Sequence, residues 1–298
     1  MTNPDPFTDD ELPTMFYSRF ASAAMPEEQR VPEAVQQLAR RGYVALSSGD
    51  LDAAECCFQE ASVLQQADGP ARSGMPQAFG RLGLVAAHRG DLPRAHDLFD
   101  LGLELARAQR TRLTAEDAML LHNLGVVARM RGRHEEAARH YTGALAIKVA
   151  VLGADHPNVA TTLAGLGFTL LQLRRPADAL GHLERARRLL SASTDASTLV
   201  MARALLGIGH AQLQLARPGP AELRMREALA LAESLHATTA QLARHRFGLA
   251  CACWYRDADA GLALAARALG EAHRARPRDE RLSVQINAWL DRRTTRAA

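Results

Sequence analysis

Residues 121–146 read LHNLGVVARMRGRHEEAARHYTGALA, and this stretch decides the fold. Leu121 lies four residues before Gly125, which is the spacing of one face of a helix. The pair Arg131-Gly132 then interrupts the pattern, and glycine readily takes the left-handed conformation that ends a helix. The stretch therefore predicts two helices joined by a tight turn, with small residues where the helices pack closely.

The same pattern recurs along the chain at a nearly constant period. Glycines at the position of Gly125 are separated by 41, 42, 42 and 42 residues. Three more tracks keep this register: one small, one bulky and apolar, and one small again. The four tracks are Gly42, Gly83, Gly125, Gly167 and Gly209; Ala54, Ala95, Ala137, Ala179 and Ala221; Phe58, Phe99, Tyr141, Leu183 and Met225; and Ala61, Gly102, Ala144, Ala186 and Ala228. Such a period is typical of stacked repeats.

A turn signal lies between the first and second tracks of every repeat. Asp can cap the next helix, and Pro suits a first helical position. Each repeat is therefore predicted to be a helical hairpin, and nothing in the chain predicts a sheet. The signals are Ser48-Gly49-Asp50, Arg89-Gly90-Asp91, Arg131-Gly132, Arg175-Pro176 and Arg217-Pro218.

These positions resemble the tetratricopeptide repeat consensus, with Leu-Gly in the first helix, Gly at the turn, and Ala, an aromatic residue and Ala in the second helix. The sequence is most similar to kinesin light chain repeats, through Glu135-Glu136-Ala137, Tyr141, Ala144-Leu145-Ala146-Ile147 and residues 151–163 (VLGADHPNVATTL). The resemblance predicts an all-α, right-handed superhelical solenoid of helical hairpins, because neighbouring hairpins stack to bury their apolar faces.

The repeats suggest the following organisation. Residues 1–33 form an acidic, Pro-containing and flexible arm, with a short helix from Asp9 to Ala24. Residues 34–276 form about six hairpins, residues 277–293 form a capping helix and residues 294–298 a tail. The apolar residues of the capping helix, Leu282, Ile286, Trp289 and Leu290, share one face.

Composition excludes several classes of protein. A hydrophobic content of 47% with 23% charged residues is ordinary for a soluble fold. No apolar stretch is long enough to cross a bilayer, and the polar, acidic start from Met1 to Glu11 predicts a cytoplasmic protein. The cysteines are predicted to be small buried hydrophobes, since neither Cys56-Cys57 nor Cys251 with Cys253 resembles a zinc or disulfide pattern. No cofactor or metal is expected.

The concave surface of such an array is the expected binding site, lined by the first helix of each hairpin. Its residues are Arg, His and amides with apolar side chains between them, and no carboxylate is among them. They suit an extended peptide or partner segment with acidic residues. The predicted site is Arg40, Tyr43, Gln77, Arg81, Leu84, His88, His122, Asn123, Val126, Met130, Phe168, Gln172, Arg203, His210, Gln214, His245 and Arg246.

The kinesin light chain resemblance adds two implications. It implies that Asn123 contacts the backbone of the ligand, a role that the other repeats do not share, because Arg40, Arg81, Gly165, Gly207 and Arg246 stand there. It also implies autoinhibition, in which the acidic arm around Asp9 to Tyr17 occupies the site until a partner displaces it.

Two other functions are alternatives to a protein-binding adaptor or scaffold. The Arg-rich surface, with Arg274, Arg276, Arg278 and Arg281, suits a nucleic-acid-associated regulatory protein, but acidic residues interrupt it. An enzyme with a His-based site is less favoured, since the histidines fall at non-equivalent repeat positions and no nucleophile lies beside a base. His134 and His140 are six residues apart, and a zinc-protease helix needs four.

Overall fold

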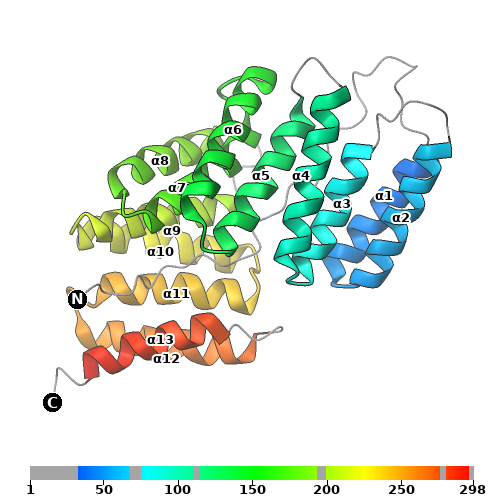
Figure 1. Cartoon of the computed structure of the whole chain (residues 1–298). Coiled ribbons are helices and arrows are strands. Elements are labelled where there is room, and N and C mark those ends of the chain that lie inside the picture. The colour runs from blue at the N-terminus through cyan, green and yellow to red at the C-terminus, as the bar shows by residue number, and fades with distance from the viewer. Residues whose placement is uncertain (1–32, 68–74, 110–113, 193–198, 276–279, 295–298) are drawn as a thin grey trace. The chain divides into compact units, whose positions relative to one another are not determined.

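The computed structural model of the chain describes residues 33–67, 75–109, 114–192, 199–275 and 280–294. Within these ranges there are thirteen α-helices and no strand. Consecutive helices pack in pairs, as Figure 1 shows. The prediction of an all-α array of helical hairpins is confirmed. The predicted arm, apart from Glu33, and its proposed short helix lie outside the described residues.

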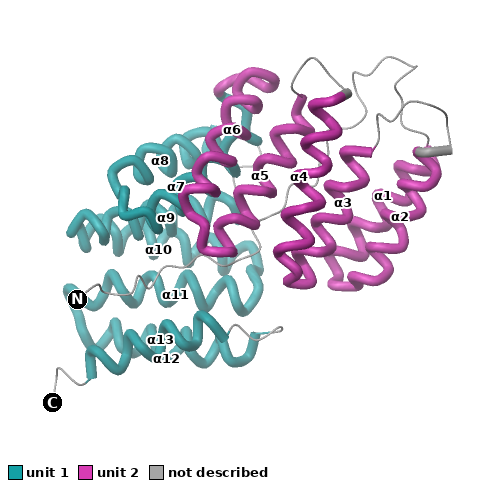
Figure 2. Tube along the Cα trace, in the orientation of Figure 1, with its two compact units in different colours: residues 1–9, 155–298 teal, residues 10–154 magenta. Residues whose placement is uncertain are grey.

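The chain divides into two compact units, shown in Figure 2. We call residues 10–154 the N-terminal unit, and residues 155–298 together with residues 1–9 the C-terminal unit.

The N-terminal unit contains three hairpins, in which α1 packs on α2, α3 on α4 and α5 on α6. Its first helices are α1 (Glu33–Ser48), α3 (Met75–His88) and α5 (Ala115–Met130), and its second helices are α2 (Leu51–Ala67), α4 (Leu92–Gln109) and α6 (His134–Leu152).

The C-terminal unit also contains three hairpins, followed by a single helix, α13, that packs on α12. Its first helices are α7 (Pro157–Gln172), α9 (Leu199–Gln214) and α11 (Thr239–Cys253), its second helices are α8 (Pro176–Ser191), α10 (Pro218–Ser234) and α12 (Ala258–Arg274), and α13 is Glu280–Thr294.

The repeat glycines lie where the two helices of a hairpin come closest. A Cβ atom on Gly125 would lie 3.0 Å from the ring of Tyr141, and one on Gly167 would lie 2.6 Å from Cγ of Leu183. Both large side chains are fully buried. The other three glycines of the track meet the bulky residue of their own hairpin in the same way. The spacing of small and bulky tracks in the sequence therefore corresponds to direct packing within each hairpin.

The turns of the two units use different residues for one backbone conformation. Gly49, Gly90 and Gly132 have φ values of 81°, 81° and 75° in the N-terminal unit. In the C-terminal unit this place is taken by Arg174 and Ala216, with φ values of 56° and 57°. L-residues are disfavoured there, so these two turns are strained. The prolines that follow were predicted as helix starts, but the left-handed residues before them were not.

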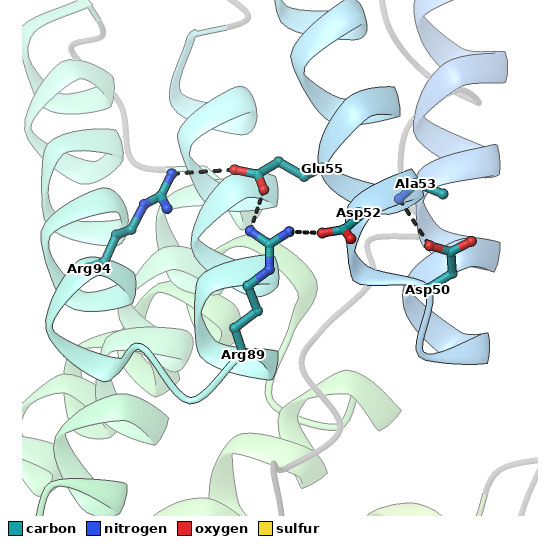
Figure 3. Close-up of polar contacts among 6 residues, drawn as sticks. All are labelled: Asp50, Asp52, Ala53, Glu55, Arg89 and Arg94. Atoms are coloured by element: carbon teal, nitrogen blue, oxygen red, sulfur yellow. Dashed lines mark hydrogen bonds and ion pairs between the residues drawn. The ribbon is translucent and has the colours of Figure 1, made fainter.

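Ion pairs join the first two hairpins at their turn edge (Figure 3). Arg89, at the turn after α3, donates to Asp52 at 2.5 Å and to Glu55 on α2. Arg94 on α4 donates to the other oxygen of Glu55 at 3.3 Å. Because the Asp52 side chain is 96% exposed, this pair contributes little stability by itself. Arg89-Gly90-Asp91 is thus a structural turn, and Asp91 accepts from the backbone N–H of Arg94 at 3.2 Å.

Helix α13 covers the end of the last hairpin with an aromatic cluster. Trp289 is 1% exposed and packs edge-on against Phe247 and Trp254, with ring centroids 5.9 Å and 5.7 Å apart. The guanidinium carbon of Arg293 lies 4.0 Å from the Trp289 ring centroid, which is a cation–π contact. Leu282 and Ile286 are buried beside this cluster.

The cysteine prediction is correct for only one of the two pairs. Cys251 and Cys253 are buried, whereas Cys56 is exposed and Cys57 is half-buried on α2. The sequence places both residues on a helix, but adjacent positions differ by about 100° around the helix axis, so Cys56 points away from the packed side.

Candidate functional site

All the predicted site residues lie on first helices. In the N-terminal unit, Arg40 and Tyr43 are on α1, Gln77, Arg81, Leu84 and His88 on α3, and His122, Asn123, Val126 and Met130 on α5. In the C-terminal unit, Phe168 and Gln172 are on α7, Arg203, His210 and Gln214 on α9, and His245 and Arg246 on α11.

Four of the N-terminal residues pack within the hairpins. Leu84 and Val126 are at most 1% exposed. Tyr43 packs edge-on against Phe58 with centroids 5.1 Å apart, and His122 packs on Tyr141 in the same way at 5.3 Å. Arg40 is exposed, and Met130 is half-buried.

Among the predicted residues of the N-terminal unit, Gln77, Arg81 and Asn123 each have a buried polar atom that forms no hydrogen bond with another described residue. Asn123 is 0% exposed, and neither its Nδ2 nor its Oδ1 has a hydrogen-bond partner there. On α3, the same holds for Oε1 of Gln77 and Nη1 of Arg81. We call Gln77, Arg81 and Asn123 the polar strip. An unmade hydrogen bond at a buried group costs about 1–3 kcal/mol, so such groups normally meet a partner.

The polar strip has a neighbour, Glu116, that was not among the predicted residues. Nε2 of Gln77 donates to Oε1 of Glu116, at the start of α5. Glu116 lies seven residues before Asn123 and therefore on the same helix face, which is the signal that could have found it. The N-terminal site consequently contains a carboxylate, although none was among the predicted residues.

His88 closes the row of predicted residues on α3. It is half-buried at the last position of the helix. Burial lowers the pKa of His88, because desolvation penalises the imidazolium form. His88 is therefore mostly neutral at neutral pH and offers one hydrogen-bond donor and one acceptor.

The predicted arginine of α11 is engaged inside the C-terminal unit. Arg246 is 2% exposed, and its guanidinium donates to Glu271 of α12 and, at 2.6 Å, to Glu233 of α10. His245, its neighbour, is 2% exposed, and its Nδ1 lies 2.8 Å from the carbonyl oxygen of Gln241. The charge of Arg246 is thus matched by carboxylates of the protein itself.

The predicted residues of α7 and α9 also contact one another. Phe168 is 2% exposed; its ring centroid lies 5.6 Å from the guanidinium carbon of Arg203 and 6.5 Å from the ring of His210. Nε2 of Gln214 donates to the carbonyl oxygen of Leu171 at 3.3 Å. Gln172 is half-buried. The side chains of this row therefore pack on each other and on the end of α7.

Nothing in the described residues forms a metal centre, since no three His, Cys, Asp or Glu side chains there are placed to share an ion.

Lys148 is an unusual ionisable group outside the predicted site. It is 3% exposed on α6, and burial lowers its pKa to about 7. None of the described helices combines the length and hydrophobicity needed to cross a membrane.

Residues 116–192 match the family model described as tetratricopeptide repeat. No curated protein matches the chain. Three solved structures show the fold likeness. BtubC (BKLC) from P. vanneervenii has a TM-score of 0.56 and 18% identity, covering 86% of this chain and 91% of that one.

NprR in complex with its cognate peptide NprX has a TM-score of 0.61 and 13% identity, covering 92% of this chain and 74% of that one. Nearly identical TPR-like repeats of kinesin light chain type from Podospora anserina have a TM-score of 0.52 and 14% identity, covering 66% of this chain and 95% of that one. At such identities the likeness concerns the fold alone.

Proposed function

We propose that the chain, whose residues 116–192 match the tetratricopeptide repeat model, is a protein-interaction adaptor or scaffold, and not an enzyme. In this proposal it holds an extended peptide or partner segment against the first helices of its N-terminal unit.

The observation that carries the proposal is the state of Asn123. Its side chain is 0% exposed, and both polar atoms lack a partner among the described residues. A carboxamide needs both a donor and an acceptor opposite it, and a peptide main chain supplies both. The resemblance to kinesin light chain, where an Asn at this place contacts the ligand backbone, supports the same role. The NprR structure, described with its cognate peptide, gives this fold a precedent for peptide binding.

We further propose that the bound segment carries acidic residues. Arg40 is exposed on α1, and Nη1 of Arg81 is unbonded among the described residues. Guanidinium groups bind carboxylates through charge-assisted hydrogen bonds. Arg246 does not serve this purpose in our proposal, because Glu271 and Glu233 already match its charge.

We also place the protein in the cytoplasm. No disulfide bond joins any of the four cysteines to another described residue, which supports a reducing compartment.

The test begins with a phage-displayed library of random twelve-residue peptides, selected on the full chain. We expect enriched peptides with acidic residues, whose affinity is then measured by isothermal titration calorimetry. Asn123→Ala should weaken binding at least tenfold, because the main-chain hydrogen bonds are lost. Asn287→Ala is the matched control, since Asn287 is exposed on α13 in the other unit. A library without enrichment, or equal affinity of the wild type and Asn123→Ala, would overturn the proposal.

A further inference from the structure

Glu116 fixes the orientation of the Gln77 carboxamide. An ionised carboxylate only accepts hydrogen bonds, so the amide must turn its nitrogen toward Glu116 and its oxygen away. This is the arrangement seen: Nε2 of Gln77 donates to Glu116, and Oε1 is buried without a partner among the described residues. The orientation therefore follows from chemistry, and the atom left for a ligand is an acceptor.

The other residues of the polar strip lie further along the two helices, Arg81 on α3 and Asn123 on α5. Gln77 meets Glu116, and one turn further on a Cβ atom at Gly80 would lie 3.2 Å from Leu120, so α3 and α5 run in the same direction. From Glu116 to Asn123 the rise is about 10 Å. About three residues of extended chain cover that length.

The unbonded atoms of the polar strip include both hydrogen-bond acceptors and donors. Gln77 offers an acceptor, Arg81 a donor, and Asn123 one of each kind. An extended main chain presents N–H and C=O groups in alternation, so it can meet all of them at once.

We propose that Glu116 is a positioning residue, which holds the Gln77 carboxamide so that its oxygen accepts a hydrogen bond from a main-chain N–H of the bound segment. The inference rests on the proposed function. It assigns the recognition of one main-chain amide to a pair of residues that contact each other across α3 and α5.

A reciprocal exchange tests the pairing. Gln77→Glu places two carboxylates together, so we expect at least tenfold weaker binding of a peptide selected from the library. The double variant Gln77→Glu with Glu116→Gln has the same net charge as the wild type. In it, the new glutamine can donate to the new glutamate, whose second oxygen is still an acceptor. Its affinity should return to within about threefold of the wild type.

A second readout reports on direct contact. The selected peptide is made as a series in which each main-chain amide in turn is N-methylated, which removes one N–H. At one position, methylation and Gln77→Met should each weaken binding, and their combination should weaken it no further. A merely structural role for Gln77 would give additive losses at every position. Thermal melting of each variant, followed by circular dichroism, establishes that it is folded.

The outcomes separate this inference from the proposed function. If no peptide is selected, the proposed function fails, and this inference fails with it. If Asn123→Ala abolishes binding while the single variant Gln77→Glu binds like the wild type, the proposed function stands and the role of Glu116 is rejected. A double variant as weak as the single variant, or additive losses throughout the methylated series, also rejects it.

Discussion

Arg81 of the N-terminal unit and Arg246 of the C-terminal unit were both predicted to face a ligand, and their surroundings differ. Arg246 is buried between Glu271 and Glu233, whereas Nη1 of Arg81 has no partner among the described residues. Residues 155–298 contain twenty arginines against thirteen carboxylates, compared with fourteen basic and thirteen acidic residues in 34–154. Between these two arginines, the one with an unbonded donor lies in the less basic unit. The comparison teaches that net charge does not tell which guanidinium is already paired.

The largest expected loss of stability follows from replacing Arg246, the arginine that is paired inside the protein. Arg246→Ala should lower the free energy of unfolding by about 3–5 kcal/mol, because buried Glu271 loses its buried partner and keeps only the exposed Arg267. Chemical denaturation followed by circular dichroism measures the loss. The double variant Arg246→Met with Glu271→Met should recover most of it, because the charges that then lose a partner, Glu233 and Arg267, have side chains that are 48% and 66% exposed to solvent. A single variant as stable as the wild type would contradict the internal role of Arg246.

The next largest loss of stability is expected where the two helices of a hairpin pack closely. Gly125→Leu should destabilise by about 3 kcal/mol, since a side chain there meets the buried ring of Tyr141. Gly181→Leu is the control, because a Cβ atom at this helical position on α8 meets nothing within 4 Å. The control should be as stable as the wild type or slightly more so. Equal melting temperatures for Gly125→Leu and the wild type would show that the repeat register is wrong.

Lys148 should make the stability of the protein depend on pH. Its pKa is about 7 in the folded state and 10.5 when solvated, so between these values the unfolded chain binds the proton and the folded chain does not. The free energy of unfolding therefore rises with pH between these two pKa values, and this gain is lost as the pH falls toward 7.

The expected gain from Lys148 between pH 7 and pH 9 is about 2 kcal/mol. Lys148→Met removes this part of the pH dependence, and denaturation curves at the two pH values measure it. If the wild type and Lys148→Met gain equally over this range, the buried position of the lysine is refuted.

The smallest expected effect on stability belongs to Arg81. Arg81→Ala should change the free energy of unfolding by less than about 0.5 kcal/mol, since it breaks no ion pair with another residue that the structure describes. The same variant should weaken binding of an acidic peptide, whereas Arg246→Met with Glu271→Met should not. Reversal of these two binding results would place the ligand in the C-terminal unit.

The fold was predictable because the residues of the periodic tracks are the ones that pack against each other within each hairpin. Gly125 and Tyr141 occur at the same offset as Gly42 and Phe58, and in both hairpins the two residues touch. The left-handed conformation of Arg174 and Ala216 was not predictable, because propensity alone argues against it. There the surrounding hairpin overrides the local preference.

The candidate site was predictable only as a set of first-helix positions. Whether a given side chain is engaged depends on residues in other helices. Glu271 lies 25 residues after Arg246, and Glu116 lies 39 after Gln77. The period of the repeat shows which residues share a helix face, but it does not tell which side chains are already paired.

The most direct test of the central claim is a crystal structure of the chain with a peptide selected from the library. Our account predicts that the peptide lies extended along α3 and α5, with one main-chain amide unit hydrogen-bonded to the carboxamide of Asn123. A peptide bound only to the C-terminal unit, or to second helices, would contradict it.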